Sequence, residues 1–405
     1  MQSLNTKLHF SKRITMSISI KTGAPVTGED FFGRKRELRN AHRYLEAHQS
    51  LLLSAPRRIG KSSLAKKLKE ELTEKGWKCL YIDLQGIATM EAFLRTLLSA
   101  LNDEKVLSRG NVRAFFEDVF GKVDGISLGK IKIDIKDRDI TESLFRRLAT
   151  LLDRTQDTLI IIDELPLFLG NLMDRNFENR DTVETMLSWF RNLRQEENSA
   201  IRWVFCGSVG LRNFTNYHNL SHTINDLTDL EVGALPQDEA KGLLKALADA
   251  YNLRMDKTLI DQTLVMLQWP IPYFIQLLID RLLINIENPA EYTVTEEDVR
   301  KAIDELSHSD RFMTWDERLK EYRNLEPIAR AVLDSLAGND SGIKKENLFT
   351  IAMEGHEATD APKIKSDLTK VLEMLIHDGY IIREDHYRKF RSPLLRKWWK
   401  YKFID

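Results

Sequence analysis

The chain contains 405 residues, more than one hydrophobic core usually accommodates, so two or three domains are expected. Its 60 basic and 61 acidic side chains leave a formal net charge of -1, which excludes recruitment of nucleic acid or of an anionic membrane by overall charge. Only two cysteines occur, both in or beside apolar runs, which excludes a disulfide scaffold and a cysteine metal site and favours a cytoplasmic protein.

Residues 1–22 lack the unbroken apolar core of a secretion signal and are interpreted as a flexible lead. No apolar stretch approaches the length of a membrane span, so no membrane partner is expected. After a turn-rich entry comes Phe31-Phe32-Gly33-Arg34, where Phe32 is suited to cover the face of a base and Gly33 to let the backbone approach it. A hydrophobic contact at the start of a helix over residues 36–49 explains these residues equally well.

The next feature is a glycine-containing turn that joins the apolar run Leu51-Leu52-Leu53 to an Ala-, Leu- and Lys-rich segment. A short buried strand, a turn and a helix start are typical of a phosphate-binding loop. The spacing fits G-x-x-x-x-G-K-[ST], except that Ala55 replaces the first glycine. In this interpretation Lys61 bridges the β- and γ-phosphates and Ser62 binds Mg2+, whereas the alternative is a basic turn before a surface helix. The residues predicted to contact nucleotide here are Pro56, Arg57, Arg58, Ile59, Gly60, Lys61, Ser62 and Ser63.

A short strand at residues 81–84 follows the first helix, and an insertion occupies about residues 103–140. Within the insertion, Ile131, Ile133 and Ile135 alternate with polar residues, which predicts a half-buried hairpin turned at Gly129. Such a hairpin either contacts a neighbouring subunit or partner, or covers a sheet edge, and we favour the second interpretation.

The run Leu159-Ile160-Ile161-Ile162-Asp163-Glu164 is continuously apolar and ends in two carboxylates. It predicts a central parallel strand, because an edge strand would alternate with polar residues. Ligands of open α/β sheets bind at the carboxyl ends of the strands. We therefore expect Asp163 to hold the Mg2+ shell and Glu164 to orient the attacking water in phosphoryl transfer.

A further strand over residues 201–208 ends in Ser208, which either contacts the γ-phosphate or its water or caps the next helix. Arg212, Arg191 and Arg194 are candidates for an arginine finger acting within the subunit or across an interface, although each alone is more often a surface charge. The succession of strands and helices predicts an α/β fold with a doubly wound parallel sheet, that is, a P-loop NTPase.

From residue 233 the pattern is helical, and Pro272 is placed in the first turn of a helix over residues 275–283 that carries Arg281, a candidate second sensor. Residues 319–405 predict a winged helix-turn-helix with helices at 328–336, 346–352 and 363–378 and a hairpin at 380–384 and 387–391. Its cations suggest contacts to a DNA backbone, whereas the alternative is that Trp398 and Phe403 pack on the ATPase core while the cations stay solvated. These cations are Arg388, Lys389, Arg391, Arg396, Lys397, Lys400 and Lys402.

Five segments of the chain together resemble the prokaryotic STAND-type branch of AAA+-like P-loop ATPases, specifically its archaeal-ATPase group. They are Phe31–Leu38, the loop with Lys61, the Asp163-Glu164 strand, Gly207-Ser208 and the segment 387–399. The resemblance covers nearly the whole chain. It implies an ATPase core over residues 23–232, a helical lid over 233–318 and a winged helix over 319–405. It also implies that Phe32, Gly33, Arg34 and Pro272 lie close to the adenine of ATP. Two departures, Ala55 and the segment Trp269-Pro270-Ile271-Pro272, predict slow hydrolysis rather than loss of nucleotide binding.

Three functional hypotheses follow. The first is a Mg2+-dependent ATPase switch that changes shape or forms a homo-oligomer with ATP and controls a separately encoded effector, as in prokaryotic defence systems. The second is an ATPase that grips duplex DNA through the winged helix. The third is a nucleotide-binding scaffold with negligible turnover.

Overall fold

The computed structural model describes residues 18–106, 110–111, 114–115, 145–150, 152, 156–175, 179–197, 199–207, 210–288 and 292–405. Nearly all of the predicted hairpin insertion lies outside the described residues, as does Ser208. Most of the predicted lead, residues 1–17, is likewise outside them. Among the described residues, no helix is both long and apolar enough to cross a membrane.

The N-terminal half contains a five-stranded sheet in the order β2-β3-β4-β1-β5, and every strand pair in it is parallel. The predicted α/β class with a parallel sheet is therefore confirmed. All residues of β3 and β4 are buried, as expected of strands covered on both faces, and in β4 this includes Arg202. The strands are β1 (Leu51–Ser54), β2 (Lys78–Asp83), β3 (Thr158–Asp163), β4 (Ile201–Cys206) and β5 (Thr228–Glu231).

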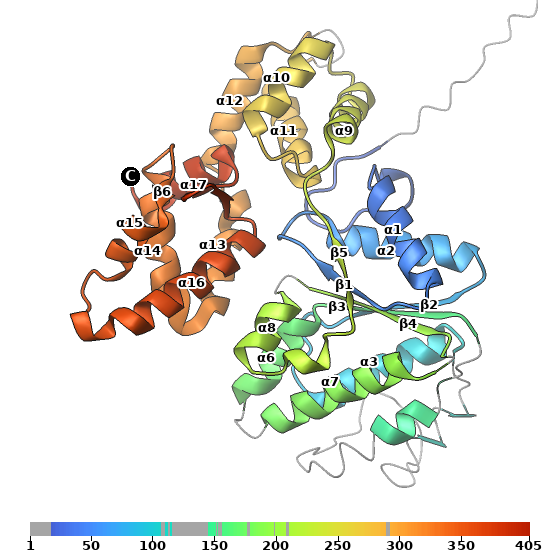
Figure 1. Ribbon diagram of the computed structural model, residues 1–405. Coiled ribbons are helices and arrows are strands. Elements are labelled where there is room, and N and C mark those ends of the chain that lie inside the picture. The colour runs from blue at the N-terminus through green and yellow to red at the C-terminus, as the bar shows by residue number, and fades with distance from the viewer. Residues whose placement is uncertain are drawn as a thin grey trace, which may run out of the picture.

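Two layers of helices cover the sheet, because successive side chains of a strand point to opposite faces. Leu53, Ile161 and Val204 belong to a core shared with α1 (Lys35–Glu46) and α2 (Lys61–Glu74). Their strand neighbours Leu52, Ile162 and Phe205 belong to a second core on the other face. Figure 1 shows the two layers on either side of the strands. The second layer consists of α3 (Met90–Asp103), α6 (Leu165–Arg175), α7 (Asn179–Gln195) and α8 (Leu211–Tyr217).

Four helices follow the sheet and form the region that we call the lid. Pro272 occupies the first turn of its third helix, as predicted, because proline lacks the N–H that a first turn leaves unpaired. The fourth helix starts at a capping box in which Thr295 and Asp298 exchange side-chain and backbone hydrogen bonds. The lid helices are α9 (Gln237–Ala250), α10 (Lys257–Leu267), α11 (Pro272–Asn285) and α12 (Glu296–Ser307).

Residues 313–405 form what we call the C-terminal unit, which lies beside the core and the lid (Figure 1). The three predicted helices and the predicted hairpin are present. A two-residue strand that the sequence did not reveal, β6, extends the hairpin to a three-stranded antiparallel sheet in the order β6-β8-β7. The predicted boundary after residue 318 falls inside a helix. The elements are α13 (Met313–Leu319), the 3-10 segment η5 (Lys320–Leu325), α14 (Glu326–Ala337), β6 (Ile343–Lys344), α15 (Lys345–Ala352), α16 (Ala361–His377), β7 (Ile381–Glu384), β8 (Tyr387–Phe390) and α17 (Pro393–Phe403).

One hydrophobic core runs from the α1–α2 face of the sheet through the lid into the C-terminal unit. Aromatic rings connect these parts, with Phe274 and Trp398 both packed on Phe312, and Trp269 packed on Trp315. Because packed cores resist continuous deformation, this shared core gives the C-terminal unit a defined position against the sheet.

Candidate functional site

The phosphate loop, residues 55–60, connects β1 to α2. Gly60, the residue before the helix, has a φ of 101°, which L residues rarely adopt. Open space lies where a Cβ on this residue would be. Gly60 and the first residues of α2 line a cleft of about 350 Å³. The start of α2, with its unpaired N–H groups and positive dipole end, therefore faces a space that suits an anion.

Lys61 lies at the bottom of this loop and is buried, with an exposed fraction of 8%. Its Nζ donates hydrogen bonds to the Ala55 and Pro56 carbonyls, at 2.7 and 2.9 Å. Burial lowers the pKa of Lys61, against the opposing influence of Glu164 and Asp163. Burial disfavours the charged form of Lys61, and the negative charge of a phosphate in the cleft would stabilise this form.

The two carboxylates at the end of β3 lie beside the loop, as the sequence predicts. Asp163 is buried, and its Oδ2 accepts hydrogen bonds from Ser62 Oγ at 2.7 Å and from the Tyr81 hydroxyl at 2.5 Å. Its Oδ1 accepts a bond from the Glu164 backbone N–H at 3.0 Å. Burial and the Asp163 charge raise the pKa of Tyr81, so the phenol stays protonated and acts as the donor. The structure thus brings Ser62 and Asp163 into direct contact.

Glu164 has φ 57°, in the left-handed region that is uncommon for residues other than glycine. It is the residue between β3 and α6, and it lines the cleft together with Gln85, which follows β2. Strained backbone of this kind is often found at functional positions, where the surrounding structure fixes it. Gln85 was not predicted, because a single glutamine after a strand carries no motif.

The cleft extends from the loop to the entry segment before α1 and to α11, where Tyr273 and Gln276 line it. Neither of those two residues was predicted, because a lid helix shows in sequence only an apolar pattern. Gly33, Pro56 and Asp163 do not line the cleft, although Asp163 contacts Ser62, which does. The predicted site residues that do are Phe32, Arg34, Arg57, Arg58, Ile59, Gly60, Lys61, Ser62, Ser63, Glu164 and Pro272.

Gly33 and Arg34 have another physical role than the predicted approach to a base. Gly33 has φ 72°, and a Cβ there would lie 2.5 Å from Glu239 Oε2 on α9. The same oxygen accepts the Arg34 backbone N–H at 2.7 Å, while the buried Arg34 guanidinium donates to the carbonyls of Ile59, in the loop, and Gly233, before the lid. These residues therefore join the loop to the lid. Phe32 lines the cleft, and its ring also packs against Gly242 of α9.

Arg57, Arg58 and Ser63 each contact a different neighbour of the loop. Arg57 Nη1 donates to the Thr314 carbonyl of α13 at 3.2 Å, and the Arg58 guanidinium lies 4.8 Å from the centre of the Tyr273 ring. Ser63 Oγ accepts the Val26 backbone N–H at 3.0 Å, which fixes the entry segment. The two arginines thus connect the loop to the C-terminal unit and to the lid.

The C-terminal unit also reaches the loop through the end of α16. His377 Nε2 lies 2.7 Å from Ser54 Oγ, and a Cβ on Gly379 would lie 2.7 Å from the Pro56 Cβ. The imidazole also lies against Gly210, where a Cβ would be 2.7 Å from its Cε1. No motif in the sequence revealed this contact, because its partners are more than 300 residues apart.

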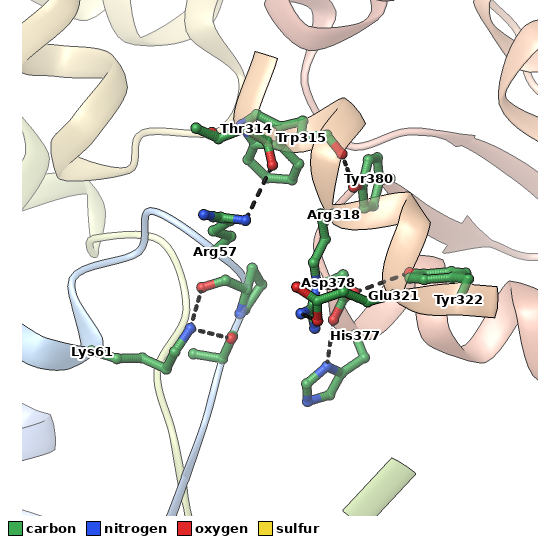
Figure 2. Close-up of polar contacts among 12 residues, drawn as sticks. Arg57, Lys61, Thr314, Trp315, Arg318, Glu321, Tyr322, His377, Asp378 and Tyr380 are labelled. Atoms are coloured by element: carbon green, nitrogen blue, oxygen red, sulfur yellow. Dashed lines mark hydrogen bonds and ion pairs between the residues drawn. The ribbon is translucent and has the colours of Figure 1, made fainter. Parts of the chain in front are cut away.

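Behind His377 stands a buried ionic cluster, which Figure 2 shows beside Lys61 and Arg57. Asp378 Oδ2 accepts hydrogen bonds from Arg318 Nε at 3.1 Å and from the Tyr322 hydroxyl at 3.0 Å, and His377 Nδ1 lies 3.1 Å from Oδ1. Although burial opposes it, Arg318 and His377 lower the pKa of Asp378 to about 2. Glu321 pairs with the same arginine. The cluster therefore fixes the end of α16 at the loop.

The candidate arginine fingers do not line the cleft. Arg212 forms a two-pronged ion pair with Asp229, Arg194 one with Asp226, and Arg191 donates to the His222 carbonyl. Arg281, the candidate second sensor, does not line the cleft either. In this arrangement none of the four side chains lines the cleft of its own subunit. A role across an interface between subunits stays a prediction.

Most cations of the C-terminal unit are engaged within the chain. The Arg391 guanidinium lies 5.4 Å from the Trp269 ring, and Arg388 is buried. Trp398 is buried, but against Phe312 rather than against the ATPase sheet, which corrects the prediction of its partner. The other cations pair with acids: Lys389 with Glu384, Arg396 with Asp340, Lys397 with Asp304, Lys400 with Asp405 and Lys402 with Asp310. These pairs reduce the positive charge available to a DNA backbone.

The residues at the cleft suit Mg2+ and a nucleotide. The available donors are a hydroxyl and two carboxylates, the oxygen ligands that Mg2+ prefers. Across the described ranges, no group of three His, Cys, Asp or Glu side chains is arranged to hold a metal ion by itself.

Part of the chain matches a known family, and its fold is similar to that of solved structures. A family model described as an AAA domain matches residues 43–214. A Walker-type ATPase of Pyrococcus abyssi matches over 96% of this chain and all of its own, with 18% identity and a TM-score of 0.59. The Aeropyrum pernix ORC1 protein in complex with DNA matches over 92% of this chain and 93% of its own, with 14% identity and a TM-score of 0.40. The RuvB Holliday junction branch migration motor of Thermotoga maritima matches over 93% of this chain and 95% of its own, with 14% identity and a TM-score of 0.42. No curated protein matches. Residues 43–214 thus match an AAA domain, and this match supports ATP binding and hydrolysis.

Proposed function

We propose that the chain is a Mg2+-dependent ATPase switch, in which the ATP-bound state determines whether the C-terminal unit stays docked on the phosphate loop. The nucleotide lies in the cleft, with its phosphates against the loop and the start of α2 and its base toward Phe32 and Pro272. We retain the division into a core (23–232), a lid and a winged helix, but place the boundary between the last two at the start of α13, residue 313, rather than at residue 319. It is supported by the three-stranded sheet and three helices at the C-terminal end.

The residues divide the chemistry as follows. Lys61 neutralises phosphate charge, and Ser62 with Asp163 holds Mg2+, which when bound supplies further positive charge at the phosphates. Glu164, at the same end of the sheet, accepts a proton from water and orients it. With Ala55 in place of the first glycine, we expect slow turnover, as a switch requires.

The observation that carries the proposal is the direct contact between the loop and the C-terminal unit. Ser54, Pro56 and Arg57 contact His377, Gly379 and Thr314, respectively. The Pro56 carbonyl also accepts a hydrogen bond from the Lys61 ammonium group. A phosphate that binds Lys61 would therefore remove a contact of Pro56, the residue that also touches Gly379. Phosphate binding and docking of the C-terminal unit thus act on one short segment, the condition for coupling between two sites.

The wider setting rests on the family resemblance. We propose a cytoplasmic homo-oligomer that controls a separately encoded effector in prokaryotic defence. The buried free thiols of Cys79 and Cys206 are consistent with a reducing compartment. The alternatives, a DNA-gripping ATPase and a scaffold without turnover, differ from the switch in measurable ways.

The test compares molar mass and shape in solution with ADP and with a non-hydrolysable ATP analogue, each with Mg2+. We expect the analogue to enlarge the particle or the assembly and ADP to leave it compact. Turnover measured in parallel separates a switch from a scaffold. Identical mass, shape and hydrogen exchange in the two nucleotide states would contradict the switch, even if ATP is bound and hydrolysed.

A further inference from the structure

Resting on the function proposed above, we infer that Tyr81 is a positioning residue for Mg2+. Its hydroxyl fixes the Asp163 carboxylate so that the Ser62 hydroxyl hydrogen points to the carboxylate and the oxygen lone pairs of Ser62 stay available to the metal ion. Nothing in the loop motif or in the acidic strand assigns a role to this tyrosine.

The hydrogen bonds at Asp163 carry the inference. The Tyr81 hydroxyl and Ser62 Oγ donate to the same oxygen, Oδ2, at 2.5 and 2.7 Å, and the Glu164 N–H donates to the other. A hydroxyl has one hydrogen and two lone pairs, so Ser62 keeps its lone pairs only while a neighbour accepts that hydrogen. Without the Tyr81 hydroxyl, the buried Asp163 Oδ2 would keep the Ser62 hydroxyl as a donor but lose the Tyr81 bond. The position of the Asp163 carboxylate would then be less restrained.

The sheet places the tyrosine at this carboxylate. Tyr81 pairs with Ile161 and Asp83 with Asp163 in the parallel register of β2 and β3, so Tyr81 and Asp163 lie on the same face of the sheet, the face that α2 covers. A phenol is long enough to reach from its own register position, opposite Ile161, to Asp163, two residues further along the neighbouring strand. A serine or threonine at residue 81 would not reach it.

The helix that carries Ser62 also restrains the ring. Lys66 follows Ser62 by four residues and thus lies on the same side of α2, one turn later. Its Nζ lies 5.1 Å from the centre of the Tyr81 ring, within the range of a cation–π interaction. Tyr81 is therefore held from both sides, by α2 through Lys66 and by β3 through Asp163.

The test is the Tyr81→Phe variant, which removes only the hydroxyl. Binding of a fluorescent ATP analogue is measured in EDTA and as a function of Mg2+. We expect affinity in EDTA to stay as in the wild type, and the Mg2+ concentration for half-maximal tightening to rise about tenfold, the effect usual for loss of a partner behind a metal ligand. Tyr292→Phe is the matched control, because that hydroxyl also donates to a carboxylate, Asp298, but on the lid.

Several outcomes overturn the inference. One is an unchanged Mg2+ requirement in Tyr81→Phe. Another is equal loss of affinity with and without Mg2+, which would indicate a structural role. In an Asp163→Asn background, Tyr81→Phe should cause no further change, and an additive effect would place the tyrosine outside this pathway. If the wild type binds no nucleotide under either condition, the proposed function itself fails, which distinguishes the two failures.

Discussion

His377 Nε2 lies 2.7 Å from Ser54 Oγ, so the last residue of α16 touches the last residue of the strand that precedes the phosphate loop. The contact joins two parts of the chain that lie 323 residues apart in the sequence, with most of the core and the whole lid between them. Behind it, Asp378 and Arg318 form a buried ion pair, which gives the contact a rigid support.

Replacing His377 with alanine should loosen this docking. The variant loses the hydrogen bond to Ser54 and a contact to Asp378. Each net hydrogen bond contributes about 1 kcal/mol, and its loss shifts the equilibrium between the docked and undocked states about fivefold. Hydrogen exchange of residues 54–60 should accelerate accordingly. His386→Ala, in the exposed turn between β7 and β8, is the control and should exchange as the wild type does. Equal protection in both variants would show that this contact does not retain the unit.

Replacing Lys61 with alanine should strongly weaken nucleotide binding while leaving the fold intact. The side chain is buried, but its removal also removes a desolvated charge, so we expect a small change in Tm. Affinity for the ATP analogue should fall by about 100-fold, roughly 3 kcal/mol, since a charge-assisted contact to phosphate is lost. Calorimetric titration measures it, with Lys67→Ala, whose side chain pairs with Glu70 on the surface, as the control. Normal hydrolysis by Lys61→Ala would place the active site elsewhere.

Replacing Glu164 with glutamine should separate binding from turnover. Glutamine has nearly the same shape but is a poor proton acceptor, so phosphate release should fall by about 100-fold or more, within the usual contribution of a general base. Analogue affinity should stay within about twofold, because the phosphate contacts lie at the loop. Phosphate release is measured alongside binding, and Glu184→Gln on α7 serves as the control. Undiminished turnover would assign the base to another residue.

Asp378 should make the docking sensitive to strong acid. Its folded pKa of about 2 lies below the usual aspartate value of 3.8, so its contribution to stability is fully present above about pH 4 and is lost as the pH falls toward 2. The shift corresponds to about 2 kcal/mol. Urea unfolding should therefore show a wild-type advantage over Asp378→Asn that is constant from pH 5 to 7 and shrinks below pH 4. A difference that does not change down to pH 2 would contradict the assigned pKa.

Neutralising the paired lysines of the C-terminal unit should leave duplex DNA binding unaffected. Lys389, Lys397 and Lys402 each pair with an acid, so each contributes little free positive charge. We expect the triple alanine variant and the wild type to show the same weak DNA affinity near physiological salt. A steep salt dependence in the wild type that is lost in the variant would revive the DNA-binding alternative.

The sequence alone determined the parallel sheet, the loop with Lys61 and Ser62, and the acidic end of β3. These features are local, because a continuous apolar run, a glycine before a helix and a carboxylate after a strand follow from residues close together in the chain. The roles of Gly33 and Arg34, the donor Tyr81 and the contact of His377 with Ser54 were decided only by the tertiary structure. Their partners come from distant segments, and side-chain contacts between such segments depend on packing and charge that no local pattern encodes.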